Sequence, residues 1–153
     1  MVRAFVRRLE REDLFRRFGH PCDFGDEATL RRYFDIDAGV GEIAYVLDKA
    51  AAIAGLAHRI MLSQSEAEIA LIVRSDLQRT GIGELLMRET LARAARQGLK
   101  TLSAFVLWEN HAALRLAGKI GYMTRHSSPW ALELAFEVAR TPAATWLRGT
   151  PVK

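Results

Sequence analysis

The sequence has one cysteine, Cys22, and no long hydrophobic run. A single thiol excludes an internal disulfide framework, and no group of cysteine and histidine residues has the spacing of a structural zinc site. The longest apolar stretches, such as Ala50–Ala57, fall well short of the roughly 20 residues that a helix needs to cross a bilayer. The N-terminus, MVRAFVRRLEREDL, also lacks the apolar core of a signal peptide. These absences predict a cytoplasmic protein with no membrane contact and no metal.

Size and charge narrow the class of protein further. The 153 residues, half of them apolar, fit a single domain with one hydrophobic core. We expect that domain over residues 1–138, and a tail of uncertain order over residues 139–153. The net charge of +4 favours an anionic ligand, although the basic residues could also simply solvate the surface. They are spread along the chain without an aromatic–basic repeat or a recognition helix, so no nucleic-acid partner is expected.

The hydrophobic pattern predicts strands with single helices between them. The strands are expected over Val2–Leu9, Glu42–Leu47, Ala51–Leu62, Ala67–Val73, Leu99–Leu107, Tyr122–Arg125 and Trp130–Val138. The helices are expected over Glu12–Phe18, Asp26–Phe34, Gly81–Gln97 and Asn110–Ile120. Asp26 is a plausible N-cap, and Gly98 a C-cap. This order predicts an α/β or α+β fold with a mixed sheet that helices cover on both faces.

The most informative segment is Ala67–Gly83, AEIALIVRSDLQRTGIG, which leads into an amphipathic helix. Glycines at the first turn of a helix let the backbone approach a ligand, and the free N–H groups there attract a diphosphate. Arg79 can add a charge-assisted contact. The pattern lacks the Gly-Lys-Ser/Thr ending of a Walker loop and the longer GxGxxG fingerprint, which argues against nucleotide hydrolysis and hydride transfer. Taken alone, it is more typical of a tight strand-to-helix turn.

The order of strand, QRTGIG turn, amphipathic helix, buried strand, Asn110-centred helix and Gly121-Tyr122 resembles the GNAT superfamily of N-acetyltransferases. The resemblance covers about residues 42–125, and more loosely residues 2–138. It implies a mixed, mostly antiparallel sheet and acetyl-CoA as cosubstrate, whose pyrophosphate is held by the family's Q/R-x-x-G-x-G/A turn. It also implies that the strand before this turn splays from the next one and pairs with pantetheine. The implied cofactor-binding residues are Ile72, Val73, Gln78, Arg79, Thr80, Gly81, Ile82, Gly83 and Asn110.

Asn110 and the position seven residues after it carry further expectations. Asn110 in WENHAAL contacts the pantetheine arm if it follows the family, and it is also a simple N-cap; both roles are compatible. Many family members have a tyrosine seven residues after the asparagine that protonates the departing thiolate, whereas this chain has Ala117. A thiol with a pKa near 8.5 is a tolerable leaving group without help, so no general acid is assigned. Tyr122 is expected in the core.

Glu68 is the expected catalytic residue. An amine must lose a proton before it attacks a thioester, and a carboxylate within reach supplies general-base catalysis. The AEIALIV context resembles bacterial protein lysine acetyltransferases, where a glutamate at this point is the base. The resemblance suggests direct transfer, with a backbone N–H of Leu71–Val73 polarising the thioester carbonyl. The alternative is that Glu68 is a surface charge at the end of a strand.

Other polar and aromatic residues are weaker candidates. Cys22 has no evident base beside it, so a covalent intermediate is not expected. His58 is expected to be half-buried in its strand, although it could face the acceptor, and the other histidines have no spacing that suggests a metal. Trp108 and Trp130 are expected to be packing residues.

The predicted function is therefore acetyl transfer from acetyl-CoA to an amine acceptor, for which a protein lysine side chain is one candidate. The acceptor groove would be built from about residues 10–40 and 123–137, the least diagnostic segments. A homodimer is left open. The alternative function is a catalytically silent regulatory domain that senses acyl-CoA, and the absence of the tyrosine at Ala117 is the feature that keeps it open.

Overall fold

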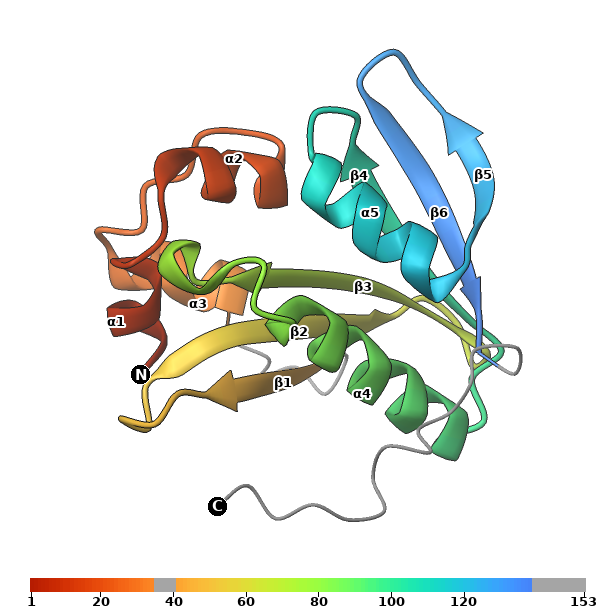
Figure 1. The fold of residues 1–153 in the computed structure, drawn as a ribbon, viewed down its shortest axis with the longest axis horizontal. Helices are drawn as coiled ribbons and strands as arrows, with labels where there is room; N and C mark the ends of the chain where they lie inside the picture. Colours follow the sequence, from red (N-terminus) through yellow and green to blue (C-terminus); the bar gives the residue numbers. More distant parts are fainter. Residues whose placement is uncertain (35–40, 139–153) are drawn as a thin grey trace.

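A computed structural model describes residues 1–34 and 41–138 of the chain (Figure 1). Its strands are β1 (Gly41–Leu47), β2 (Ile53–Met61), β3 (Glu66–Val73), β4 (Thr101–Leu107), β5 (Met123–Ser127) and β6 (Ala131–Glu137). Its helices are α1 (Val2–Val6), α2 (Arg11–Phe18), α3 (Glu27–Phe34), the 3-10 helix η1 (Ser75–Leu77), α4 (Ile82–Arg96) and α5 (His111–Ile120). The expected tail over residues 139–153, Trp146 included, lies outside the described residues.

The strands of the described part of the chain form one six-stranded sheet in the order β1-β2-β3-β4-β6-β5. Only β3 and β4 run parallel; the other neighbouring pairs are antiparallel. A parallel pair needs a crossover connection, and α4 supplies it between β3 and β4. The mixed, mostly antiparallel sheet is thus confirmed.

Helices cover both faces of the sheet, and a separate hydrophobic core lies on each face. On one face α4 and α5 pack against β3, β4 and β6, and this core contains Ile69, Met87, Leu91, Leu102, Ile120 and Leu134. On the other face α1 and α3 pack against β2 and β3, and this core contains Phe5, Val6, Leu30, Phe34, Leu56 and Ile72. The sheet is therefore a middle layer, and residues of β3 alternate between the two cores.

This alternation decides where Glu68 points. Ala67 and Ile69 belong to the core beneath α4 and α5, while Ile72 belongs to the core beneath α1 and α3. Because successive side chains of a strand point to opposite faces, Glu68 lies on the same face as Ile72. It is half-buried there.

Most of the predicted boundaries are confirmed because they depend on local capping. Asp26 caps α3, since its Oδ1 accepts a hydrogen bond of 2.8 Å from the Thr29 backbone N–H. Gly98 follows α4 with a φ of 77°, and the Leu99 N–H donates back to the Ala94 carbonyl at 3.0 Å. Both are standard helix ends that short sequence patterns reveal.

The predicted first strand over Val2–Leu9 is wrong, because Val2–Val6 forms the helix α1. Val2, Phe5, Val6 and Leu9 are spaced i, i+3, i+4 and i+7, which places them on one helical face. Phe5 and Val6 are both buried, and Val2 and Leu9 pack against the same core. Two consecutive buried residues do not fit a strand with one solvent face, so packing selected the helical period over the alternation of Val2, Ala4 and Val6.

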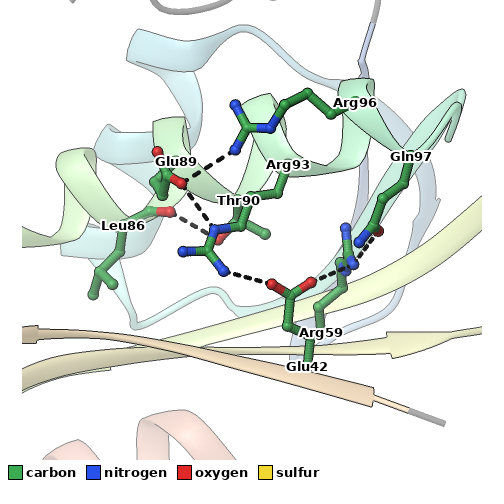
Figure 2. A network of polar contacts seen from close by, with 8 residues as sticks. All are labelled: Glu42, Arg59, Leu86, Glu89, Thr90, Arg93, Arg96 and Gln97. Atoms are coloured by element: carbon green, nitrogen blue, oxygen red, sulfur yellow. Dashed lines mark hydrogen bonds and ion pairs between the residues drawn. The ribbon is translucent and has the colours of Figure 1, made fainter. Parts of the chain in front are cut away.

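A polar network joins β1 and β2 to the C-terminal half of α4, as Figure 2 shows. The Arg59 side chain is 6% exposed and donates to Glu42 Oε2 at 2.5 Å and to the Gln97 side chain. The other Glu42 oxygen accepts from Arg93 at 2.7 Å. One carboxylate thus bridges a buried and a partly exposed arginine, and it fixes the helix whose N-terminal end forms part of the candidate site.

Candidate active site

A gap opens between β3 and β4 in the middle of the sheet. Their parallel pairing comprises Glu66 with Thr101, Ala67 with Leu102 and Glu68 with Ser103. Beyond Glu68 the two strands diverge, as Figure 1 shows, and within the described residues β3 pairs only with β2 from Ile69 to Val73. Backbone N–H and C=O groups need partners, so this edge of β3, which includes Ile72 and Val73, can bind an amide-containing ligand.

The turn after β3 ends in a helix N-terminus without a side-chain cap. Gly81 is the N-cap of α4 with a φ of 91°, and no side chain caps the helix there. Arg79 also has a positive φ, of 59°, and Thr80 Oγ1 donates to the Leu77 carbonyl at 2.5 Å. The first N–H groups of α4 have no intrahelical acceptors and carry the positive end of the helix dipole. The turn can therefore hold an anion such as a diphosphate.

Arg74 anchors this turn to the rest of the protein. Its buried guanidinium donates to Asp48 Oδ2 at 2.8 Å and to Asp76 Oδ1 at 2.6 Å. Its backbone N–H donates to the Ala54 carbonyl at 2.8 Å. A hydrogen bond from the Ala52 N–H, followed by the contact with Arg74, holds the pKa of Asp48 below its usual value. The geometry of the turn is thus set before any ligand binds, which lowers the cost of binding.

A neighbouring set of hydrogen bonds ties α2 to the same turn. Ser75 Oγ donates to Asp13 Oδ2 at 2.5 Å and accepts from the Glu10 N–H at 2.9 Å. Ser75 begins η1 and Glu10 is the N-cap of α2. The position of α2 over the sheet therefore depends on the segment that leads into the glycine turn.

The two glycines of the turn are expected to respond differently to replacement by alanine. Because Gly81 has a positive φ, we expect Gly81→Ala to cost about 1 kcal/mol and to weaken acetyl-CoA binding about fivefold as the turn shifts. Gly83 is helical, and a Cβ there would lie 3.5 Å from Leu116 Cδ2, an ordinary contact. Gly83→Ala should leave acetyl-CoA affinity within about twofold and not lower stability.

Thermal unfolding and calorimetric titration with acetyl-CoA measure both variants. Equal affinities for acetyl-CoA in the two variants would show that the conformation of Gly81 does not hold the ligand.

Asn110 is the N-cap of α5. Its side-chain Oδ1 accepts a hydrogen bond of 3.1 Å from the Ala113 N–H. The capping role is confirmed. Its amide nitrogen donates to none of the residues that the structure describes, so a contact from that nitrogen to a ligand remains compatible with the cap.

Glu68 lies at the last paired position before the gap opens. Along β2, Ile60 pairs with Glu68 and His58 with Ala70, so His58 and Glu68 share one face of the sheet. His58 is half-buried as expected, and burial, with a smaller contribution from the charge of Arg17, lowers its pKa. Glu68 makes no hydrogen bond or ion pair with a described residue, which leaves both carboxylate oxygens available to accept a proton.

Glu66 occupies the same face of β3 but differs from Glu68 in its contacts. It forms an ion pair with Arg125 of β5, and this contact with Arg125 holds the pKa of Glu66 below its usual value. Paired in this way, Glu66 is a poor proton acceptor. Glu68 is therefore the carboxylate of β3 whose contacts suit a base.

The structure places no phenol at the position of the family's tyrosine. Ala117 is buried in the core between α5 and the sheet. Tyr122 is 40% exposed, so the expectation that it lies in the core is wrong. Trp108 and Trp130 are also exposed, the second by 70%, and the expectation of packing residues is wrong for them as well. Their segments meet through a backbone hydrogen bond, in which the Trp108 main-chain N–H donates to the Trp130 carbonyl at 3.0 Å.

Cys22 has a basic neighbour that the sequence did not reveal. Its Sγ lies 3.4 Å from His20 Nδ1, and His20 Nε2 lies 3.1 Å from the Tyr33 hydroxyl. Burial nevertheless raises the pKa of the Cys22 thiol. A thiol that holds its proton is a poor nucleophile, so this contact does not support a covalent intermediate.

Two absences concern the described residues alone. Over residues 1–34 and 41–138, no group of three or more histidine, cysteine or acidic side chains is placed to hold a metal ion. In the same part of the chain no helix is both long and apolar enough to span a bilayer.

Known structures share this fold. The GNAT domain of PAT from S. lividans is 18% identical, with a TM-score of 0.79 over 89% of this chain and 82% of that chain. Spermidine N-acetyltransferase from Vibrio cholerae, solved with CoA and spermine, is 16% identical, with a TM-score of 0.75 over 90% of this chain and 88% of that chain. N-acetyltransferase PseH from Campylobacter jejuni, solved with acetyl coenzyme A, is 22% identical, with a TM-score of 0.61 over 72% of this chain and 78% of that chain.

These likenesses define the fold as that of N-acetyltransferases. Over residues 5–122 the sequence also matches the profile of the acetyltransferase (GNAT) family. The chain belongs to the acetyltransferase (GNAT) family.

Proposed function

We propose that this protein transfers the acetyl group of acetyl-CoA directly to an amine, and that Glu68 is the general base. The observation that carries the proposal is the position of Glu68 at the last paired residue of β3 before the gap. There its carboxylate is half-buried and free of ion pairs with the described residues. The catalytic domain comprises residues 1–138.

The gap and the glycine turn fit acetyl-CoA. The free edge of β3 at Ile72 and Val73 offers backbone groups to the pantetheine amides. The turn from Gln78 to Gly83, with Arg79, Thr80, Gly81 and Ile82 inside it, offers N–H groups and one guanidinium to the pyrophosphate. Asn110 at the start of α5 completes the set. Bound acetyl-CoA supplies an acyl group activated as a thioester.

The residues of the chain then have separate tasks. Glu68 takes the proton from the acceptor ammonium, which frees the nitrogen lone pair. A backbone N–H of Leu71–Val73 polarises the carbonyl as the C–N bond forms and the C–S bond breaks. The second proton of the nitrogen is then lost to solvent, which leaves the neutral amide and the free thiolate. No acid is assigned to the thiolate, because Ala117 replaces the family's tyrosine and a thiolate leaves without one.

The acceptor is an amine, and a protein lysine side chain is the candidate that the AEIALIV context favours. The half-buried face that bears Glu68 and His58 is where the acceptor amine would bind. The structural relatives include a spermidine N-acetyltransferase and a GNAT domain of PAT.

Acceptor-dependent release of free thiol tests the proposal. The protein is incubated with acetyl-CoA and, in separate reactions, with polyamines, amino acids and lysine-bearing proteins, and the products are identified by their mass shift. We expect thiol release that requires one of these amines and a matching gain of one acetyl group. Binding of acetyl-CoA without any acceptor-dependent release would favour the alternative, a regulatory domain that senses acyl-CoA.

A further inference from the structure

Arg17 is a half-buried arginine that forms no ion pair with a described residue. It lies on α2, and its Nε is buried with no hydrogen-bond partner among the described residues. Its Cζ lies 4.7 Å from the ring centroid of Phe18, so the contact that it makes is with an aromatic face. Burial lowers the pKa of Arg17 to about 10, and the guanidinium is still charged at neutral pH.

The charge of Arg17 acts on the candidate active site. Glu68 is its main electrostatic partner, followed by Cys22, and the same charge lowers the pKa of His58. Nevertheless no ion pair within 4.0 Å joins Arg17 to Glu68 or to another described residue. The packing agrees with the electrostatic interaction, because Leu14 and Phe18 of α2 contact the core on the face of the sheet that bears Glu68.

A guanidinium nitrogen that is buried without a hydrogen bond is costly. Buried charges in proteins are paired as a rule, and each exception needs an explanation. The protein could have removed this cost by pairing Arg17 with Glu68, which would have neutralised the base. A ligand with an anionic group accounts for both observations, because it would supply the partner that Arg17 lacks and leave Glu68 free.

A groove lies beside α2. It has a volume of about 1120 Å³, and its charged lining residues are the arginines Arg3, Arg7, Arg11 and Arg16 and the acidic residues Glu12, Asp23 and Glu109. Arg3 and Arg16 are paired with acidic side chains, whereas Arg7 and Arg11 form no ion pair with the described residues. Cys22 lines the groove and is also affected by the charge of Arg17, so Arg7 and Arg11 add to the attraction for an anionic acceptor on this side of α2.

We propose that the acceptor carries a carboxylate near its amine, and that Arg17 binds this carboxylate while Glu68 receives the proton of the amine. A guanidinium fork matches a carboxylate with two parallel hydrogen bonds. The proposal rests on the proposed function and names the class of acceptor. The carboxylate has two sources: the α-carboxylate of a free amino acid, or an acidic residue that flanks a lysine in a peptide.

Matched acceptors on the unaltered protein separate these sources. One arm compares free amino acids with their α-amides, which have the same size but no negative charge. The other compares a blocked peptide with a lysine between two glutamates and the same peptide with two glutamines. In at least one arm we expect kcat/KM to be about ten- to a hundredfold higher for the carboxylate, the scale of a charge-assisted hydrogen bond.

Variants assign the preference to Arg17. Arg17→Met should remove it to within about twofold, and Arg17→Lys should keep part of it because the charge stays but the fork is lost. The control is Arg31→Met on α3, since Arg31 is exposed, is paired with Glu27 and does not line the groove; this variant should keep the preference.

A binding measurement separates this inference from the proposed function. Each acceptor is titrated calorimetrically into the protein saturated with CoA. A carboxylate preference in binding without acetyl transfer would uphold the Arg17 site and overturn the proposed function. Equal kcat/KM and equal binding for all matched acceptors, or a preference that survives Arg17→Met, would overturn the Arg17 site.

Discussion

Glu68→Gln is expected to lower kcat for acetyl transfer roughly a hundredfold or more, the usual scale for a lost general base. Glutamine keeps the size of the side chain but cannot accept the proton. Because the side chain makes no hydrogen bond to a described residue, stability should change little. Acetyl-CoA affinity should also be unchanged, since the turn and the β3 edge are intact. Steady-state kinetics and calorimetric titration measure the two effects separately.

The matched control for this prediction is Glu66→Gln. Glu66 belongs to the same strand and points to the same face, but it is held in an ion pair with Arg125. We expect kcat to stay within about threefold of the unaltered protein, because Glu66 is paired and is not the proton acceptor. The loss of this surface ion pair should lower the free energy of unfolding by only about 0–1 kcal/mol. Similar kcat values for the two variants would remove Glu68 from the mechanism.

The largest loss of stability is expected from Glu42→Ala. This change would leave Arg59, whose side chain is 6% exposed, without its anionic partner. Removing one member of a buried ion pair typically costs about 3 kcal/mol or more. For a chain of this size that corresponds to a drop in Tm of about 6–12 °C. Thermal and urea unfolding measure it.

Glu89→Ala is the control for Glu42→Ala. The two glutamates are almost equally exposed, at 28% and 29%, and both contact Arg93. Glu89, however, pairs with Arg93 and Arg96 along the surface of α4 (Figure 2), for which about 0.3–0.5 kcal/mol is expected. Equal losses of stability in the two variants would contradict the assignment of the cost to buried Arg59.

Predictions from the sequence succeeded where the signal was local. The cap at Asp26, the end of α4 at Gly98 and the start of α5 at Asn110 each depend on a few neighbouring residues. The glycine turn was found for the same reason, because QRTGIG lies between a strand pattern and a helix pattern in one continuous segment. The expected splay of β3 from the next strand agrees with the short parallel pairing.

They failed where packing chose between alternatives. The segment Val2–Val6 fits two periods, and contact with α3 and the sheet selected the helix. The exposure of Tyr122 and of the two tryptophans depends on which parts of the surface other elements cover, and no local pattern carries that information.

The sequence by itself determined the class of fold, the family, the glycine turn and Glu68 as the candidate base. These signals are strand and helix periods and one contiguous motif, which depend only on residues close together in the sequence. Only the tertiary structure packed α2, which carries Arg17, over the face of the sheet that bears Glu68, placed His20 beside Cys22 and joined Glu42 to Arg59. Such contacts depend on how the helices pack over the sheet, and no pattern in the sequence indicates which distant residues will meet.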